Sequence, residues 1–412
     1  MKNVGFNTAL LHQPAGGDPA TGATLTPVYQ SSAFSHGSAE EVEKIFENKA
    51  FGFSYTRINN PTVEAFEKKV TALEGGIGSV ACASGMAALT NAFLNILQTG
   101  DEILSAPGLY GGTIDLFRDF EAFGIKTRYA AENTPEAFNV QVNERTRLIF
   151  AETIGNPKLD VTDIWGLAQI AHNHDLPLII DNTTATPFLV RALDLGADIV
   201  VNSSSKYMNG NSDAISGILT DGGTYRWTRE KYPGLKDYVK FGKMAYVAKL
   251  RNGLFRNTGA CLSPQNAFLN CLGLETLGLR MERQCENALE LAGFLSQLDK
   301  SIAVNYPGLP ESPWHELARR QFHNGFGAII TFRAGSKERA FQIINRLKVP
   351  LIVSNIGDTK TLVIHPASTI SLHCTAEEKI ASGVYDDLIR ISVGIENIED
   401  LKADFEQAFK EV

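Results

Sequence analysis

The feature that most constrains the fold is a regular alternation of short apolar runs with helical patterns from Pro61 to about residue 205. The runs have the length of β-strands, and in order they are "SVACA", "DEILSAP", "IKTRYA", "RLIFAET", "PLIIDNT" and "DIVVNSS". Helical stretches such as "TIDLFRDFEAFG" and "VTDIWGLAQIAHNHD" separate them. This alternation predicts an α/β fold with a mostly parallel sheet covered by helices. Ligands bind such sheets at the carboxyl ends of the strands, so functional residues are expected just after the runs.

Three of these strand ends carry residues suited to holding a small molecule. "SVACA" is followed by "SGMAA", which opens a helix at Gly85, and the free N–H groups of a helix start suit an anion. "PLII" is followed by Asp181, and "DIVVNSS" by Lys206, which lies 206 − 181 = 25 residues further on. Each feature alone has an ordinary explanation in tight packing, helix capping or a solvated cation. The prediction therefore depends on their combination.

That combination is what pyridoxal phosphate chemistry requires. Lys206 supplies an amine for a Schiff base with the aldehyde, and partial burial would lower its pKa. Asp181, paired with the pyridine nitrogen, would keep the ring able to accept electrons. The helix start at Gly85, with Ser203 and Ser205, would hold the phosphate. We therefore expect pyridoxal 5'-phosphate as the cofactor.

Charge and cysteine content exclude other classes. The 412 residues carry a net charge of −8, which leaves no basic excess for nucleic acid. The longest apolar stretch is interrupted by polar residues and no signal-like segment opens the chain, so no membrane contact and a cytoplasmic location are expected. His172 and His174 point to different sides of a helix, His365 is given no catalytic role, and no metal is expected. The five cysteines lack a C-x-x-C pair, which favours free thiols; they are Cys82, Cys261, Cys271, Cys285 and Cys374.

Further motifs resemble the Cys/Met-metabolism enzymes of pyridoxal phosphate fold type I, from "TPVYQSSAF" to "IRISVGIEN". "YTRINNPT" is similar to the family's Y-S-R-x-x-N-P-T, which implies that Tyr55 and Arg57 reach the cofactor phosphate of a neighbouring subunit. "SGMAA" matches the phosphate turn and implies backbone donors at Gly85 and Met86. "YGGT" implies that Tyr110 stacks on the cofactor ring and assists proton transfer at the leaving group.

The second half of the resemblance concerns the substrate. "ETIGNP" is similar to E-T-P-x-N-P and implies that Asn156 lies near the ring's phenolic oxygen or the substrate carboxylate. "IRISVGIE" implies that Arg390 binds the α-carboxylate with two parallel hydrogen bonds. "DNTTATP" departs from the family pattern, because relatives usually have an aromatic where Thr183 or Thr184 stands. "SSSK" replaces S-x-T-K and keeps a hydroxyl at Ser205.

Within the family, four features indicate a resemblance to the O-acetylhomoserine sulfhydrylases. Residues 246–288 are similar to their longer insertion, and "SNIGDTKTLVIHPAST" places Asn355 where cystathionine enzymes usually have serine. Those enzymes tend to have a glutamate for a second substrate ammonium where this chain has Lys360, and a like charge there would repel it. Gly112 stands where methionine γ-lyases commonly have cysteine. The resemblance implies replacement of acetate by sulfide or methanethiol, giving homocysteine or methionine.

Alternatives stay open at this point. Methionine or homocysteine γ-lyase activity and a cystathionine γ-synthase-like reaction use the same groups, and a related chain could also serve as a binding module without turnover. The acyl group and the sulfur donor are not fixed by the residues. Residues 1–60 carry the turn-rich stretch "QPAGGDPATGAT" and are expected to form an extended N-terminal arm that contacts a neighbouring subunit. The resemblance further implies a cofactor-binding domain at 61–258 and a smaller α+β domain at 259–412. It also implies a homotetramer built as a dimer of active dimers, with Asn156, Asn355 and Arg390 on the substrate.

Overall fold

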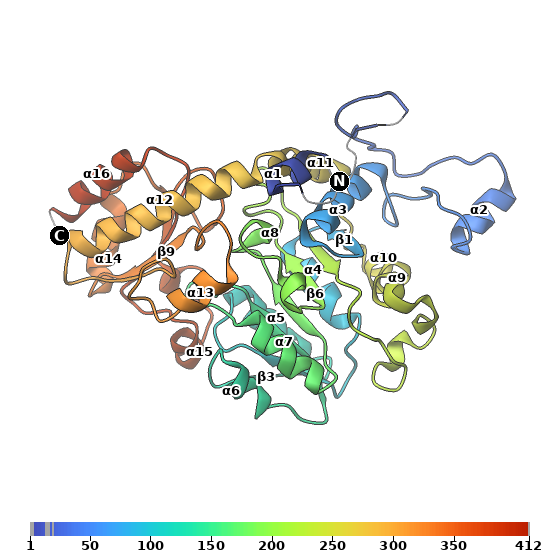
Figure 1. Ribbon diagram of the computed structural model, residues 1–412, viewed down its shortest axis with the longest axis horizontal. Helices are drawn as coiled ribbons and strands as arrows, with labels where there is room; N and C mark the ends of the chain where they lie inside the picture. Colours follow the sequence, from blue (N-terminus) through green and yellow to red (C-terminus); the bar gives the residue numbers. More distant parts are fainter. Residues whose placement is uncertain (1–3, 13–16, 19, 411–412) are drawn as a thin grey trace.

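The first sheet forms the centre of the larger half of the molecule (Figure 1). The computed structural model describes residues 4–12, 17–18 and 20–410. The strands of this sheet are β1 (Gly78–Cys82), β2 (Glu102–Ser105), β3 (Lys126–Tyr129), β4 (Thr146–Glu152), β5 (Leu178–Asp181), β6 (Ile199–Asn202) and β7 (Gly217–Asp221). They are ordered β1-β7-β6-β5-β4-β2-β3. Only β7 runs antiparallel to its neighbours, so the predicted mostly parallel sheet is confirmed.

The helices around this sheet begin and end at residues with recognisable caps. Asn60 accepts hydrogen bonds from the first turn of α3 (Pro61–Glu74), which ends at Gly75 with a left-handed φ of 77°. Ser84 caps α4 (Gly85–Leu94) in the same way. Rings from α4, α5 and β4 meet in the core, where Phe93 contacts both Phe117 and Phe150. The other helices of this half are α5 (Gly111–Glu121), α6 (Pro135–Asn139), α7 (Ile164–Asn173), α8 (Thr186–Leu189), α9 (Ala245–Asn252), α10 (Leu254–Thr258) and α11 (Pro264–Glu275).

A second, smaller sheet lies in the C-terminal half. Its strands are β8 (Ala303–Asn305), β9 (Ile329–Arg333), β10 (Leu351–Ile352), β11 (Leu362–Ile364) and β12 (Leu388–Ser392). The order is β10-β11-β12-β9-β8, antiparallel except between β10 and β11. The helices of this half are α13 (His315–Gln321), α14 (Lys337–Arg346), α15 (Ala376–Ala381) and α16 (Ile398–Phe409).

One long helix, α12 (Leu277–Leu298), connects the two halves (Figure 1). Its first turns contribute Leu277 and Met281 to the core under the first sheet. Its last turns contribute Leu291 and Leu295 to the core under the second sheet. The two hydrophobic cores therefore share one continuous helix.

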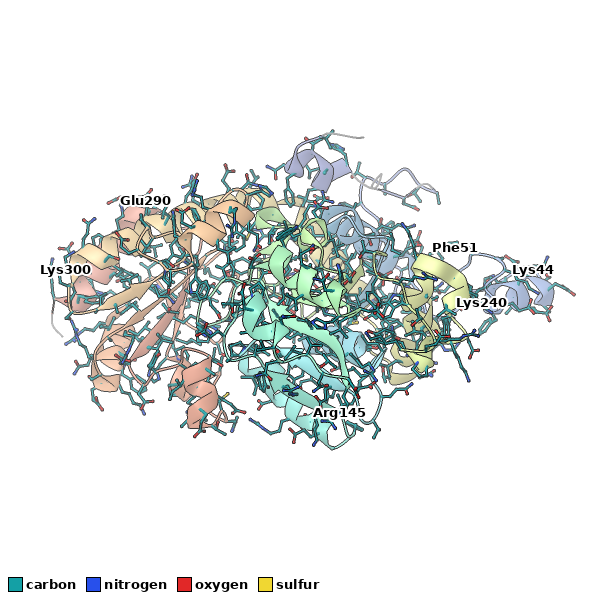
Figure 2. All side chains as sticks on the ribbon, turned by 60° about the horizontal axis from the view of Figure 1, so that its bottom comes forward. Lys44, Phe51, Arg145, Lys240, Glu290 and Lys300 are labelled. Carbon is teal, nitrogen blue, oxygen red and sulfur yellow. The ribbon has the colours of Figure 1, made fainter. Side chains whose placement is uncertain are left out.

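The N-terminal arm is more helical than its sequence suggested. It carries α1 (Phe6–His12) and α2 (Ala39–Phe46), where an extended chain was expected. Ser38 caps α2, and its amphipathic pattern explains the helix. Part of the turn-rich stretch, residues 13–16 and 19, lies outside the described residues. Figure 2 shows Lys44 and Phe51 on the segment that extends away from the body, on the side opposite Glu290 and Lys300.

All five cysteines are unbridged, and three of them are buried. Across the described ranges, no helix combines the length and apolar character needed to cross a bilayer.

Candidate active site

A cavity of about 490 Å³ lies at the carboxyl ends of the first sheet and reaches the second sheet. Asp181 ends β5 and pairs in register with Glu152, which ends β4. Lys206 follows β6, and Arg390 comes from β12 of the other sheet. Ten of the predicted site residues line this cavity: Gly85, Met86, Tyr110, Asn156, Asp181, Ser203, Ser205, Lys206, Asn355 and Arg390.

The amine of Lys206 is held near the middle of the cavity. Its Nζ donates to Oδ1 of Asn355 at 2.5 Å. Burial lowers its pKa to about 8, and the positive charge of Arg390 contributes to the shift. A larger fraction of this amine is therefore neutral near neutral pH than is usual for lysine, as a nucleophile or base requires.

The guanidinium of Arg390 is buried and only partly satisfied. Nη1 donates to Oδ1 of Asn156 and Nη2 to the carbonyl of Asn355, each at 3.0 Å. Nε is buried and has no partner among the described residues. An unpaired charged donor is costly inside a protein, so this group is suited to a carboxylate that arrives with a ligand.

Two carboxyl groups lie side by side at the strand ends. Burial raises the pKa of Asp181 and of Glu152, and the charge of Asp181 raises that of Glu152 further. One oxygen of Asp181 accepts the backbone N–H of Thr183. Glu152 accepts the backbone N–H of Tyr110 at 2.7 Å. Sequence reasoning did not assign Glu152, although its position at the end of an apolar run is the signal that identified Asp181.

The start of α4 lies against the loop after β6. The chain at Gly85 lies so close to Ser203 that a Cβ on Gly85 would be 2.6 Å from that of Ser203. The backbone N–H of Ser203 donates to the hydroxyl of Thr183. Ser205 is differently engaged, since its hydroxyl donates to the carbonyl of Ser216 and accepts from the N–H of the same residue.

Tyr110 sits at the first turn of α5 with its ring against Gly112. A Cβ on Gly112 would lie 2.6 Å from Cε1 of Tyr110. A cysteine there, as in methionine γ-lyases, would require the tyrosine ring to move. Burial raises the pKa of the Tyr110 phenol, while the charge of Arg390 opposes that shift. The phenol therefore stays protonated at neutral pH and can donate a proton.

Tyr55 and Arg57 do not line the cavity within one chain. The guanidinium of Arg57 lies 5.4 Å from the ring centre of Tyr55, and its Nη1 donates to the carbonyl of Arg256. Both residues belong to the N-terminal arm. Their predicted contact with a neighbouring subunit's phosphate stays a prediction.

The prediction that Lys360 would repel a second ammonium group of the substrate is wrong, because Lys360 does not line the cavity. Its Nζ pairs with Asp358 at 2.8 Å, and the residue is absent from the cavity lining. Its charge is paired with that carboxylate, on a side chain that is more than half exposed. The two histidines of α7 are also engaged elsewhere, His172 with Asp198 and His174 with Asn139. His365 is buried against Ser368 and the Asp386 carbonyl, outside the cavity.

A model of the Cys/Met metabolism PLP-dependent enzyme family matches residues 7–410. The chain belongs to this family. It is 41% identical to the O-acetyl-L-homoserine sulfhydrylase of Corynebacterium glutamicum, an alignment that covers 98% of this chain and 97% of that protein. It is 38% identical to the homocysteine/cysteine synthase of Saccharomyces cerevisiae, an alignment that covers 99% of this chain and 98% of that protein.

Solved structures agree with the fold. An O-acetylhomoserine (thiol)-lyase structure from Campylobacter jejuni superposes with a TM-score of 0.92 at 32% identity, covering 99% of this chain and 100% of that one. That structure carries a pyridoxyl-lysine phosphate. Cystathionine γ-lyase from Lactobacillus plantarum superposes with a TM-score of 0.84 at 33% identity, covering 98% of each chain. The architecture is therefore that of the fold type I pyridoxal phosphate enzymes.

The chain is a pyridoxal phosphate-dependent enzyme, and the cavity fits that cofactor. Lys206 presents an amine with a lowered pKa, and Asp181 lies at the neighbouring strand end. The missing Cβ of Gly85 leaves the helix start free to meet a phosphate. These three groups surround one space large enough for the ring and a small amino acid.

Proposed function

We propose that this chain is an O-acetylhomoserine sulfhydrylase, which replaces the acetate of O-acetyl-homoserine by sulfide or methanethiol and gives homocysteine or methionine. The observation that carries the proposal is the meeting of Lys206, Tyr110 and Arg390 in one cavity. Relatives with 40% and 41% identity bear this name.

The charge of the cavity favours a neutral acyl group. Among the described residues, the cationic groups that line the cavity are Lys206 and Arg390. Lys206 is needed for the cofactor and Arg390 for the α-carboxylate of the substrate. The remaining charged groups are the carboxyls of Glu152, Asp181 and Asp213. A succinyl ester would bring another carboxylate without a cation to receive it, which disfavours it relative to acetyl.

The reaction we derive begins with binding. Arg390 would hold the substrate carboxylate through its unpaired Nε and a neighbouring nitrogen, with Asn156 fixing the plane of the guanidinium. When bound, pyridoxal phosphate supplies an aldehyde for the substrate amine and an electron sink for the carbanion at Cα. Asp181 would supply the negative charge that keeps the ring nitrogen protonated.

The proton transfers would then fall to two side chains. Nζ of Lys206, once free, would remove the α-proton and move a second proton at the β-carbon, while Oδ1 of Asn355 holds the amine in place. The protonated phenol of Tyr110 would assist the departing acetate at the γ-carbon. Sulfide or a thiolate would add to the same carbon, and the protons would return in reverse order.

Steady-state assays of O-acetyl-homoserine, O-succinyl-homoserine and methionine, each without a nucleophile, with sulfide and with cysteine, test this function. We expect the highest kcat/KM for O-acetyl-homoserine with sulfide, and at least about tenfold less for the succinyl ester, as a single unpaired charge would cause. Faster release of 2-oxobutanoate from methionine than formation of homocysteine would instead identify a γ-lyase. Activity only with cysteine as the nucleophile would identify a cystathionine γ-synthase-like enzyme.

We also propose that the active unit is a homodimer, assembled into a tetramer. The support is that Tyr55 and Arg57, which lie between α2 and α3, do not line their own chain's cavity. The arm would deliver both residues to a neighbour's phosphate. The division into residues 1–60, 61–258 and 259–412 is part of the same proposal, as is a cytoplasmic location.

A further inference from the structure

Behind the cavity, two buried polar side chains meet at the ends of two elements. Glu74 is the last residue of α3 and has no exposed surface, and Asn202 is the last residue of β6 and is 1% exposed. Nδ2 of Asn202 donates to Oε1 of Glu74 at 2.8 Å. Neither residue lines the cavity.

The contact leaves one acceptor on each side without a partner. Oε2 of Glu74 and Oδ1 of Asn202 are both buried, and neither meets a donor among the described residues. An ionised carboxylate has no hydrogen to donate, so these two oxygens cannot satisfy each other. Two unpaired buried acceptors at one contact are unfavourable and call for an explanation.

A proton on Oε2 would supply the donor that Oδ1 of Asn202 lacks. A carboxylic acid and a primary amide are both planar, and each has one donor and one acceptor at its edge. We propose that Glu74 is a neutral carboxylic acid that forms a reciprocal pair with Asn202, with Nδ2–H donating to Oε1 and Oε2–H donating to Oδ1. The pair positions the end of β6.

The surroundings of Glu74 favour the neutral form. Burial raises its pKa to about 7, although the nearby amide groups of Asn202 and Asn182 favour the ionised form. Two charged groups act on it from the segment after α8, with Arg191 favouring ionisation and Asp194 opposing it. Asp221, on β7 next to β6, also has a pKa raised to about 7, so a test must separate the two carboxyl groups.

The pair is placed to affect the cofactor site without touching it. Asn202 is followed directly by Ser203, which packs on Gly85 and donates its N–H to Thr183. Lys206 lies three residues further on, and its N–H donates to the Ser203 carbonyl. Fixing Asn202 therefore fixes the start of the loop that carries the phosphate contacts and the reactive amine. Glu74 is a positioning residue in this sense.

Two substitutions separate the neutral acid from a carboxylate. Glu74→Gln keeps a planar group with one donor and one acceptor, so it reproduces both hydrogen bonds and cannot ionise. Glu74→Leu keeps the volume and leaves Asn202 without either partner. Glu64→Gln, at a partly exposed position of the same helix where the side chain pairs with Lys68, is the matched control. Asp221 is unchanged in all of them.

The measurement is the thermal midpoint of the holoenzyme between pH 5 and pH 8, together with the dissociation constant for pyridoxal phosphate. Because the folded pKa lies above the ordinary 4.5, the stability from the bound proton is full below that value and is lost as the pH rises toward 7. We expect the wild-type midpoint to equal that of Glu74→Gln at pH 5 and to fall about 3 °C below it at pH 8. Glu74→Leu should weaken cofactor binding by on the order of tenfold, and glutamine should restore it.

Other outcomes overturn the proposal. If the difference between wild type and Glu74→Gln does not change between pH 5 and pH 8, Glu74 is ionised throughout and the reciprocal pair does not exist. If Glu74→Gln fails to fold, or loses as much stability as Glu74→Leu at pH 5, an amide does not replace the acid. If Glu74→Leu binds the cofactor as wild type does, the pair does not position the loop.

Discussion

At the scale of single residues, Arg390 makes the sharpest demand, because its Nε lies buried without a partner. Arg390→Lys keeps one charge but loses the planar fork that also holds Asn156 and the Asn355 carbonyl. Losing one charged hydrogen bond removes about 1.5 to 3 kcal/mol, or about ten- to a hundredfold in kcat/KM. Steady-state kinetics with O-acetyl-homoserine measure this loss, and the bound cofactor should remain yellow.

Arg333→Lys is the control for that substitution. It is an arginine of the same sheet, half-exposed and paired with Asp387, outside the cavity. Its kcat/KM should equal that of the wild type. If Arg390→Lys instead loses the cofactor, or keeps the parental efficiency, Arg390 is structural and another group binds the carboxylate.

Lys206 predicts a pH dependence for cofactor capture. Its pKa is lowered to about 8 by burial and by the charge of Arg390, so the reactive neutral amine accumulates as the pH rises through that value. The rate at which cofactor-free enzyme forms its Schiff base should rise about tenfold per pH unit below 8 and level off above it. Stopped-flow absorbance follows this rate. An inflection near the ordinary 10.5 would contradict the assigned environment, and Lys206→Ala should give no covalent cofactor.

The residues that sequence reasoning identified are those whose position in the chain already implies their chemistry. Asp181 and Lys206 follow apolar runs, and parallel strands bring such ends together. Glu152 also follows an apolar run, but the motif that begins with it, "ETIGNP", was interpreted only through Asn156. Ser205 was expected to bind the phosphate, but its hydroxyl donates to the carbonyl of Ser216, eleven residues later. No local sequence pattern indicates that contact.

At the scale of elements, the junction of α4 with the loop after β6 depends on the missing side chain of Gly85. Gly85→Ala would place a Cβ 2.6 Å from that of Ser203, and something must shift. We expect the helix start to move away and the affinity for pyridoxal phosphate to fall by at least about tenfold, as loss of one good anion contact would cause. Equilibrium titration by absorbance measures this affinity.

Gly293→Ala, in α12, controls for the general effect of adding a methyl group to a helical glycine. A Cβ there meets nothing within 4 Å. The variant should bind the cofactor like the wild type and should be more stable by about 0.5 to 1 kcal/mol. Unchanged cofactor affinity in Gly85→Ala would show that this close approach is not needed for the phosphate.

The elements that are easiest to predict from sequence are those with strong local signals. Helix α3 has proline at its start and glycine after its end, and the strand runs are short and apolar. Helix α2 was not predicted, although Ser38 caps it and its first turn carries two glutamates. The turn-forming residues before it favoured an extended chain instead. Strand β7 was missed because its place, between β1 and β6 and antiparallel to both, depends on pairing with distant segments.

At the scale of the whole molecule, the projecting arm predicts complementation between inactive subunits. Arg57→Ala should disable the phosphate contact that a subunit supplies to its neighbour, and Lys206→Ala disables its own site. In a hybrid dimer one site combines both defects and the other is intact. Random exchange should therefore restore about one quarter of the wild-type activity.

Activity assays after subunit exchange, with exchange verified by mass-tagged chains, measure this recovery. A mixture of Arg333→Lys and Lys206→Ala chains is the control. It shows how much activity remains when active chains are only diluted by inactive ones. No recovery by the Arg57→Ala mixture, despite complete exchange, would mean that each chain completes its own site.

Helix α12 has a consequence for how the enzyme loses its structure. Its first turns are packed in one core and its last turns in the other, without a break in its 22 residues. When either core melts, half of this helix loses its packing, and helices of a few turns are marginal in water on their own. The two sheets should therefore behave as one cooperative unit, with a single calorimetric transition and no long-lived half-unfolded species for proteases to cut.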